Sequence, residues 1–483
     1  MAPVGGLGSA HEETALQGFP VSAFFPHMNP ATTLPEIRRN CSPKPLEGKD
    51  LRDFFVETSE ARDHLGNLRD RLTELFTETD SFRRVLVYGH RGCGKSTELN
   101  RFREDLGNKK WLVVHFSIKE LLPDFGIHPE DILLAIAVAI FGAAEDENLK
   151  VSDKHLAHVK NFFASVTTSE LSSRDANLEA SHGAGVEGTS LWASLLGLHA
   201  AIKGDLKFGT RSEKSTVMNV RRAPAELIAA LDGLIEAVRT ALEDDGRRLL
   251  IIVEDLDKMN LADAHRVFVE NASLLASPSS NLIYTIPLFT FHSSDADAIR
   301  AAFDESIPFP MMEVVNLEKQ LAPGYAVISE IIRKRVSSLI LDDDAVDLLI
   351  RGTGGVLRNV FEALLLVSSF RNIRDRAINR DDIRTALDRL SRELGAQIGW
   401  PRKEDGSRDA PDDLFQRLAE IARSQAAGEA VYATSDSRIE VLLRSGSLIE
   451  YNGGGWLGVH PLARKFLADQ GHAVGPDPYG LEP

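Results

Sequence analysis

One short stretch of the chain constrains its fold more than any other. Residues 85–88 form an apolar run that leads into the pattern Gly-x-x-x-x-Gly-Lys-Ser over residues 89–96, and residues 98–102 continue with a helical pattern. A strand, a glycine-rich loop and a helix in this order are typical of a phosphate-binding loop. Its glycines let backbone N–H groups surround phosphate oxygens in front of a helix N-terminus. The sequence therefore predicts a binding site for a nucleoside triphosphate.

The residue types in this loop have distinct chemical tasks. Lys95 is expected to reach the β- and γ-phosphates, and the Ser96 hydroxyl to coordinate Mg²⁺. The alternative, an ordinary glycine-rich turn before a surface helix, is disfavoured because every fixed position of the pattern is present. ATP and Mg²⁺ are the expected cofactors. The other predicted cofactor-binding residues are Gly89, His90, Arg91, Gly92, Cys93, Gly94 and Thr97.

A second stretch supplies carboxylates. The apolar run over residues 249–253 is followed by Glu254 and Asp255, with Asp257 as a third acid nearby. A buried parallel strand carries such acids to its C-terminal edge, where the phosphates and the metal ion lie. One acid is expected to hold Mg²⁺ together with Ser96, and the other to orient the attacking water. Glu254 and Asp255 are the candidates for both roles, and the sequence leaves their division open.

Composition narrows the class of protein. A chain of 483 residues exceeds the size of a single hydrophobic core, so more than one domain is expected. A hydrophobic content of 43% and a charged content of 26% are typical of soluble globular proteins. The net charge of −16 argues against a surface devoted to binding polyanions.

Three features favour a cytoplasmic location. Cys41 and Cys93 are the only cysteines in the sequence, and a disulfide at Cys93 would lock the phosphate loop, so free thiols in a reducing compartment are expected. Residues 1–20 lack the basic start and the apolar centre of a signal peptide. The most apolar run, residues 132–144, is too short to span a bilayer.

Alternating strand and helix patterns predict an α/β fold, a parallel-sheet P-loop core covered on both faces, with a helical lid and a C-terminal winged helix. After the phosphate-loop strand and the acid-bearing strand, strands are expected at residues 111–116, 281–287 and 310–315. The expected units are an extended or flexible arm over residues 1–54, the core over 55–320, the lid over 321–394, a linker over 395–413 and the winged helix over 414–475.

Residues 167–216 are rich in Ser, Gly and Ala, and an insertion is expected there. Its apolar island, residues 191–198, is either a locally folded hairpin or a patch that docks a partner or touches a membrane.

In the C-terminal unit, Asn452-Gly453 between two apolar runs predicts a hairpin, and the order helix, helix, hairpin and helix suggests a winged helix.

Together these motifs resemble the AAA+ and STAND branches of the P-loop ATPases. The string over residues 254–258 is similar to the Asp-Asp-Leu-Asp-Arg strings of signalling ATPases, and the spacing from 281 to 394 looks most like origin-recognition-type ATPases and bacterial STAND-like conflict-system proteins. The resemblance implies that Thr285, at a strand tip, and Arg358, at the start of a lid helix, face the γ-phosphate. It also implies nucleotide-controlled self-association or partner engagement, including roles in antiviral defence.

The chain departs from these families at two points. Glu254 stands where the families usually have aspartate, and no arginine finger can be assigned. Arg300 lies in a region where a finger would be plausible, but a solvated helix residue is the simpler interpretation.

Two function classes fit the sequence. The first is a slowly hydrolysing ATP switch that controls a homo-oligomer or a partner protein, and the second is an initiator- or loader-type ATPase that binds duplex DNA. Residues 411–472 hold eight acids and six bases, and the expected recognition helix offers only Arg438 and Arg444. Duplex binders place several Lys and Arg side chains against phosphates. The balance favours the protein switch over the DNA-binding ATPase.

Overall fold

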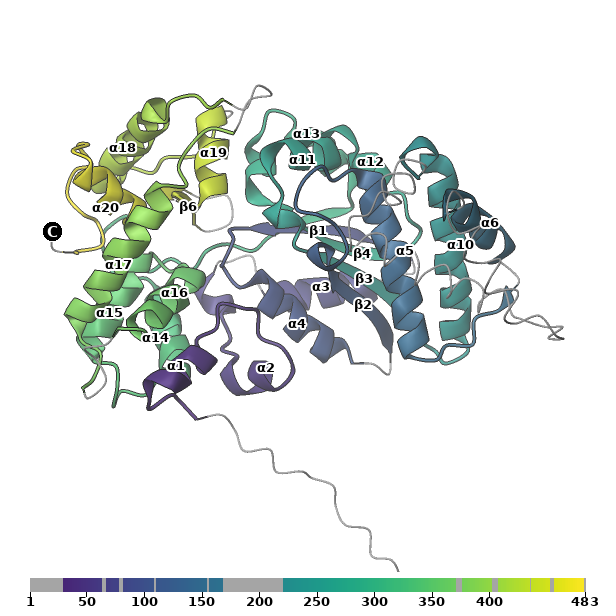
Figure 1. Cartoon of the computed structure of the whole chain (residues 1–483), viewed down its shortest axis with the longest axis horizontal. Coiled ribbons are helices and arrows are strands. Elements are labelled where there is room, and N and C mark those ends of the chain that lie inside the picture. The colour runs from purple at the N-terminus through teal and green to yellow at the C-terminus, as the bar shows by residue number, and fades with distance from the viewer. Residues whose placement is uncertain are drawn as a thin grey trace, which may run out of the picture.

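In the computed structural model, the strand that leads into the phosphate loop lies inside a five-stranded parallel sheet (Figure 1). The strands follow the order β2-β3-β4-β1-β5, and each pairs with its neighbours in parallel. Only β4 therefore separates β1 from β3, the strand that carries the acids. The strands span Arg84–Gly89 (β1), Trp111–Ser117 (β2), Arg248–Glu254 (β3), Asn281–Pro287 (β4) and Glu305–Pro308 (β5).

The structure describes most of the chain in separate ranges. The predicted insertion, apart from residue 167, lies outside these ranges together with its apolar island. The glycine-rich turn of the predicted C-terminal hairpin, residues 452–455, also lies outside them. The described residues are 29–62, 67–77, 81–107, 110–153, 156–167, 220–370, 376–401, 407–434, 436–451 and 456–481.

Side chains of the sheet alternate between two apolar layers, as the period of a strand requires. Leu86 belongs to the layer formed with α5, α6 and α10, whereas Val85 and Val87 belong to the layer formed with α3 and α4. Figure 1 shows the sheet between α4 and α5. The predicted sheet with two covered faces is confirmed. The helices span Leu68–Thr77 (α3), Lys95–Leu106 (α4), Pro129–Asp146 (α5), Leu156–Thr167 (α6) and Pro224–Glu243 (α10).

The last strand differs from the prediction. Residues 310–315 were expected to form it, but β5 ends at Pro308, and Met311 forms only an isolated bridge to Tyr451. Pro308 still pairs with Tyr88, and the Phe309 N–H donates to the Tyr88 carbonyl over 2.7 Å, so the pairing ends where β1 gives way to the phosphate loop. Short helical segments complete the core: Ser59–Ala61 (η1), Ile118–Glu120 (η2), Leu256–Lys258 (η5), Leu261–Ala264 (α11), His265–Glu270 (η6), Ala272–Leu275 (α12), Leu288–His292 (η7) and Ala296–Ala302 (α13).

The segment before the core also differs from the prediction. Residues 29–54 contain two short helices, α1 (Leu34–Asn40) and α2 (Gly48–Phe54), instead of an extended or flexible arm. Thr33 and Glu36 form a capping box at the start of α1, a pattern that stabilises a helix N-terminus. The buried side chain of Ile37 joins the apolar core of the lid.

Four helices form the lid, as the sequence predicts. The turn between α15 and α16 contains Gly354 and Gly355, both with positive φ. Asn379, followed by Asp381 and Asp382, is a sequence pattern that predicts a helix cap, and the structure confirms it, because the Asn379 side chain accepts hydrogen bonds from the N–H groups of both aspartates. The lid helices span Pro323–Arg335 (α14), Asp343–Thr353 (α15), Leu357–Val367 (α16) and Arg380–Gly395 (α17).

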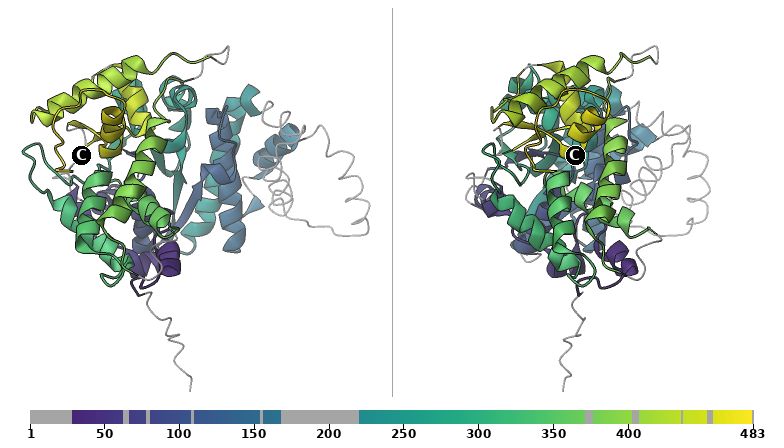
Figure 2. Two further views of the ribbon diagram at one scale, coloured as in Figure 1. Left: turned by 60° about the vertical axis from the view of Figure 1, so that its left-hand side comes forward. Right: turned by 90° about the vertical axis from the view of Figure 1, so that its left-hand side faces the viewer.

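The C-terminal unit has the order of elements expected of a winged helix, with an antiparallel pair of short strands. Its last helix contacts α17 of the lid (Figure 2), where the Ser391 hydroxyl donates to the Leu462 carbonyl over 2.7 Å. The helix α19 contacts η7 of the core. No described helix is long and apolar enough to cross a membrane. The elements span Asp412–Ala426 (α18), Ser437–Ser445 (α19), Leu448–Glu450 (β6), Leu457–Val459 (β7) and Pro461–Asp469 (α20).

Candidate nucleotide-binding site

The phosphate loop joins β1 to α4 through glycines that no other residue could replace without strain. Gly92 and Gly94 have φ values of 80° and 106°, in the left-handed region that favours glycine. A Cβ atom on Gly89 would lie 2.2 Å from the carbonyl oxygen of Phe309, and one on Gly92 would lie 2.7 Å from Cβ of Arg358. The loop is therefore shaped by its glycines and touches the lid directly.

Lys95 is buried at the first position of α4. Its Nζ donates to the carbonyl oxygens of Gly89 and His90, each over 2.9 Å, and lies 2.8 Å from Oδ2 of Asp257. Burial lowers the pKa of Lys95, but the attraction of Asp257 and other nearby anionic groups outweighs it, and the pKa is raised. Burial likewise raises the pKa of Asp257, but Lys95 and Arg91 more than offset this, and the pKa is lowered. Both groups are therefore charged.

The other two acids after β3 point elsewhere. Oε1 of Glu254 lies 3.1 Å from Nε2 of His115. Asp255 accepts a hydrogen bond from the Ser117 hydroxyl over 2.7 Å and pairs with Lys258. Neither acid lines the two cavities next to the loop, and their predicted roles stay predictions. Asp257, which the sequence marks only as a third acid nearby, is the one that faces the loop.

The conformation of Asp255 explains this exchange. Its φ of 68° lies in the left-handed region, where Asn and Asp are the commonest residues after glycine. The chain therefore turns sharply after β3, and the short helix η5 brings Asp257 beneath Lys95. A sequence signal for this choice is weak, since nothing in the string over residues 254–258 dictates the turn.

A cavity of about 260 Å³, called here the loop cavity, opens on the loop and the first turn of α4. Its wall contains Lys95, Ser96 and Thr97, further polar side chains such as Lys44, Arg62 and Arg335, and a set of apolar side chains. Polar and apolar groups in one cavity suit a nucleotide, whose phosphates need N–H donors and whose base needs apolar contacts. The apolar side chains are those of Pro43, Pro45, Leu46, Phe54, Phe55, Val56, Ile331, Leu357 and Phe361.

Sequence reasoning missed the N-terminal part of this wall. The Leu46 N–H donates to Oγ1 of Thr97 over 3.2 Å, and Nδ2 of Asn100 donates to the Leu46 carbonyl over 3.0 Å. These bonds fix the segment before the core against the helix that follows the phosphate loop. The only sequence signal was the cluster of prolines and aromatic residues near residues 43–55.

Arg62, also missed, supports the loop from behind. Its guanidinium is buried, donates to the Cys93 carbonyl over 2.7 Å and stacks on the Phe309 ring at 3.8 Å. In a trans peptide the carbonyl and the next N–H point in opposite directions. By holding the Cys93 carbonyl, Arg62 fixes the direction of the Gly94 N–H as well. Cys93 and Cys41 are both free, as predicted.

Arg358 and Thr285 occupy different environments. Arg358 lies in the first turn of α16, and its side chain lines the loop cavity and a second cavity beside it. Within the described ranges it forms no ion pair with Glu362, which accepts a hydrogen bond from Asn359 instead. Thr285 is buried opposite Val87 in the sheet, its hydroxyl has no described partner, and it lines neither cavity. Arg300 pairs with Asp297 on the surface of α13.

The C-terminal unit reaches the phosphate loop through β6. The N–H of Glu450 donates to Nε2 of His90 over 2.6 Å, and the Glu450 carboxylate pairs with His292. Burial lowers the pKa of His90 to about 3, and the charge of Lys95 adds to this effect. His90 is therefore neutral, with its proton on Nδ1, because Nε2 must accept a hydrogen bond.

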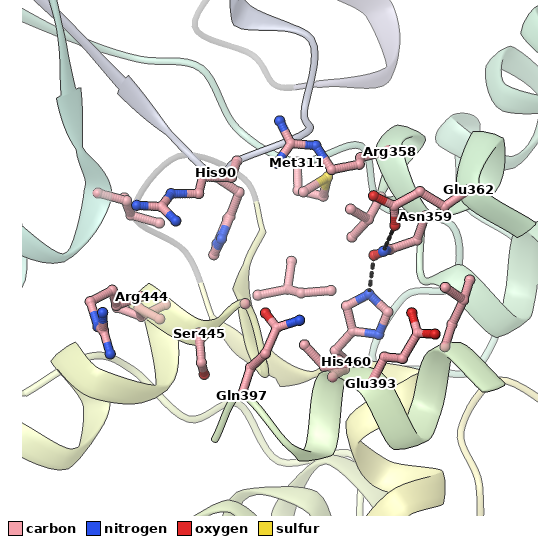
Figure 3. Close-up of a pocket in the computed structure, with 18 of the residues that line it drawn as sticks. His90, Met311, Arg358, Asn359, Glu362, Glu393, Gln397, Arg444, Ser445 and His460 are labelled. Carbon is pink, nitrogen blue, oxygen red and sulfur yellow. Dashed lines mark hydrogen bonds between the residues drawn. The ribbon is translucent and has the colours of Figure 1, made fainter. Parts of the chain in front are cut away.

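A second cavity of about 650 Å³, called here the lid cavity, lies between the loop, α16, α17 and the C-terminal unit. Figure 3 shows Arg358, Glu362 and Asn359 on one side of it and Arg444 and Ser445 on another, with His90 and His460 in its wall. Nε2 of His460 donates to Oδ1 of Asn359, and its Nδ1 accepts the Leu462 N–H. Burial lowers the pKa of His460 to about 3.

Comparison with known proteins finds distant likenesses. No family model and no curated protein matches the chain. The chain is similar to the Orc1 protein of Aeropyrum pernix in complex with DNA, with 13% identity and a TM-score of 0.37 over 90% of this chain and 97% of that chain. A variant of RuvB from Thermotoga maritima shares 13% identity with a TM-score of 0.31, over 83% of this chain and 91% of that chain.

The buried histidines predict a loss of stability in mild acid. His90 and His460 have pKa values of about 3 when folded, whereas an ordinary histidine titrates near 6.5. Below pH 6.5 the unfolded chain therefore binds protons that the folded chain does not. The stability that these neutral side chains contribute is present above pH 6.5 and is lost as the pH falls, by up to about 1.4 kcal/mol per pH unit for each histidine.

Chemical denaturation at pH 7, 6 and 5 would measure this effect. His90→Gln keeps an acceptor for the Glu450 N–H and should make the decline in unfolding free energy shallower. His158→Gln, at an exposed position on α6, is the matched control and should leave the decline unchanged. Equal slopes in the wild type and in His90→Gln would contradict the assignment of His90 as a neutral buried side chain.

Proposed function

We propose that this chain is an ATP-binding, slowly hydrolysing switch whose nucleotide state controls self-association or the engagement of a partner protein. The fold is that of a P-loop NTPase core with a lid and a winged-helix unit. The observation that supports the switch is that a single loop touches all three units. Gly92 contacts Arg358 of the lid, His90 bonds to Glu450 of the C-terminal unit, and Lys95 pairs with Asp257 of the core.

The phosphate end of the loop cavity suits ATP. Lys95 is held by two carbonyl oxygens and one carboxylate, and the phosphates of a bound nucleotide would offer it stronger anionic partners. The N–H groups of the loop and of the first turn of α4 would donate to the same phosphates. The apolar side chains of Pro43, Pro45 and Leu46 and of residues 54–56 would contact the base.

The residues present also suit Mg²⁺. Magnesium in NTPase sites takes one or two carboxylates together with phosphate oxygens and waters. Ser96 lines the loop cavity, and Asp257, which pairs with Lys95, lines both cavities. The described part of the chain holds no group of three His, Cys, Asp or Glu side chains that could bind a metal ion by themselves, so the phosphates would complete the coordination. Bound Mg²⁺ would neutralise charge that develops on the phosphates.

We propose that the Asp257 carboxylate would bind Mg²⁺, with the predicted Glu254 and Asp255 as alternatives. Glu254 ends β3 beside His115, and Asp255 bonds to Ser117, so neither is aimed at the loop in this conformation. A water-orienting carboxylate would have to leave its present partner. Slow turnover follows from this arrangement, because catalysis then requires a rearrangement before each hydrolysis step.

The lid and the C-terminal unit would respond to the nucleotide through their contacts with the loop. A ligand shifts a conformational equilibrium only by its differential affinity for the two states. Arg358 lines the loop cavity, where it would contact the γ-phosphate of ATP. ADP has no γ-phosphate and would not make this contact. The bond from Glu450 to His90 transmits the state of the same loop to β6. A role in bacterial antiviral defence rests on the family resemblance alone.

Duplex DNA binding is the weaker alternative. The expected recognition helix, α19, contacts η7 of the core and is not a free surface. Of its two arginines, Arg438 donates to both carboxylate oxygens of Asp436, and Arg444 lines the lid cavity. Neither side chain is therefore presented for phosphate contacts along a duplex.

The first prediction from this proposal is that Lys95→Ala abolishes tight ATP binding. The substitution removes the charge that would lie among the phosphate oxygens. Calorimetric titration with ATP and with ADP measures the loss. The variant also leaves Asp257 buried without its partner, so a lower unfolding free energy, by about 3–5 kcal/mol, is expected and must be measured alongside.

Light scattering of the same pair of proteins tests the switch. ATP should change the mass of the wild type and leave that of Lys95→Ala unchanged. Unaltered ATP affinity in folded Lys95→Ala would rule out this site. Tight, salt-dependent binding of the full chain to duplex DNA, without an ATP-dependent change in mass, would favour the initiator-type alternative.

The second prediction concerns the acids after β3. Asp257→Asn, Glu254→Gln and Asp255→Asn should each fold and each slow the release of phosphate, with the water-orienting acid costing about 10²-fold or more. Single-turnover phosphate release measures the rates. Asp297→Asn, at an exposed position on α13, is the control. If none of the three variants is slower than the control, hydrolysis does not use this edge of the sheet.

The third prediction concerns Arg358. Arg358→Ala should weaken ATP binding by about ten-fold or more and leave ADP affinity nearly unchanged, because one charge-assisted hydrogen bond to the γ-phosphate is lost. Calorimetry with both nucleotides gives the ratio. Arg300→Ala, whose arginine pairs with Asp297 at the surface, is the matched control. An equal loss for both nucleotides, or no loss, would place Arg358 outside the γ-phosphate contacts.

A further inference from the structure

Four arginines line the lid cavity; Arg389 pairs with Glu393, and the other three come from three different units. Arg91 belongs to the phosphate loop, Arg358 to α16 of the lid, and Arg444 to the last turn of α19 in the C-terminal unit. Figure 3 shows Arg358 and Arg444 in the wall of this cavity together with His90. The fold thus brings cations that are far apart in the sequence to one cavity beside the phosphate loop.

These three arginines lack acidic partners among the described residues. Arg91 donates to the backbone carbonyls of Asp257 and Met259 over 3.2 and 3.4 Å. Arg358 and Arg444 form no ion pair within the described ranges, and Nε of Arg444 is buried without a hydrogen-bond partner. The three guanidinium groups therefore carry charge that no described carboxylate neutralises by direct pairing.

The acids in the cavity wall are already engaged. Asp257 pairs with Lys95, and Glu393 pairs with Arg389 over 2.9 Å. Glu362 accepts a hydrogen bond from Asn359 and lies near Arg358 without pairing with it. An incoming anion would consequently meet arginines whose donors are not saturated.

The arrangement is electrostatically costly when no anion is present. Burial lowers the pKa of Arg91, the charge of Asp257 opposes this shift, and the neighbouring Arg444 and Arg358 lower the pKa further. Burial also lowers the pKa of Arg444, with Arg408 adding to the effect. Like charges held together away from water disfavour their own charged forms, and an anion between them reverses the penalty.

The chemistry of the cavity selects the anion. Guanidinium groups bind phosphate through paired N–H donors, and arginine is favoured wherever such planar recognition is needed. A volume of about 650 Å³ lies in the range of small-molecule sites, and the wall adds apolar side chains from Phe289, Leu365 and Leu390. The cavity therefore has room for a phosphate together with an organic group.

We propose that Arg91, Arg358 and Arg444 form a phosphate-binding site in the lid cavity. Two sources of phosphate fit. Arg91, Arg358 and Asp257 line both cavities, so the terminal phosphate of a nucleotide in the loop cavity could reach the site. This source rests on the proposed function, whereas a separate phosphate ester that enters the lid cavity does not.

Arg444 distinguishes this site from the nucleotide site. It lines the lid cavity and not the loop cavity, and it comes from the C-terminal unit. A phosphate bound by all three arginines bridges the core, the lid and the C-terminal unit. The site would therefore hold the winged-helix unit against the core when it is filled and release one restraint when it is empty.

Calorimetry on the full chain tests the proposal with three probes: ADP, a non-hydrolysable ATP analogue and pyrophosphate. Arg444→Ala is compared with Arg438→Ala, on the same helix, whose arginine pairs with Asp436. If the terminal phosphate is the source, Arg444→Ala weakens the ATP analogue by about ten-fold or more and leaves ADP unchanged. If a separate ester is the source, pyrophosphate binds to Lys95→Ala and no longer binds when Arg444→Ala is added.

A thermal melt without ligand adds a second readout. Arg444→Ala removes one charge from a like-charged cluster, so its melting temperature should equal or exceed that of the wild type, whereas a packing role would lower it. Unchanged binding of all three probes overturns the proposal, whatever the melting temperature of the variant. If neither ADP nor the ATP analogue binds to the wild type, the proposed function fails, and the pyrophosphate arm still decides whether this site exists.

Discussion

The site depends on one buried ion pair, between Lys95 at the start of α4 and Asp257 after β3. Taking two charges out of water is expensive, and a buried pair persists only when close geometry and further hydrogen bonds offset that cost. Here the carbonyls of Gly89 and His90 supply those bonds to the ammonium group. The pair therefore fixes the position of the loop relative to the turn after β3, and any anion that attracts Lys95 also changes what holds that turn.

Around this pair the phosphate loop acts as a meeting point for the three units. Gly92 leaves just enough space for Cβ of Arg358, and the neutral ring of His90 accepts a hydrogen bond from the strand β6. These contacts need small or neutral residues at the loop, because a larger side chain would push the lid away and a protonated ring would lose its acceptor. The same loop that fits phosphates thus also sets the positions of lid and C-terminal unit.

The sequence predicts best what is local. The loop over residues 89–96, the strand β4 and the cap at Asn379 each depend on neighbouring residues, and the structure contains all three. The sequence predicts poorly those features that depend on distant contacts or on a single backbone angle. The left-handed turn at Asp255 selects Asp257 as the loop-facing acid, and the bond between His90 and Glu450 joins residues 360 positions apart. No short-range pattern encodes either.

The segment before the core has a mechanical consequence. Asn40 bonds to the Arg335 carbonyl on α14 of the lid, while Leu46 bonds to Thr97 and Asn100 on α4. The chain between these two anchors is a tether from lid to core, and a fully extended segment of this length spans only about 20 Å. The lid can swing within that reach while both anchors hold. A wider opening has to break bonds at the wall of the loop cavity itself, so the tether makes full opening of the lid and disassembly of that wall a single event.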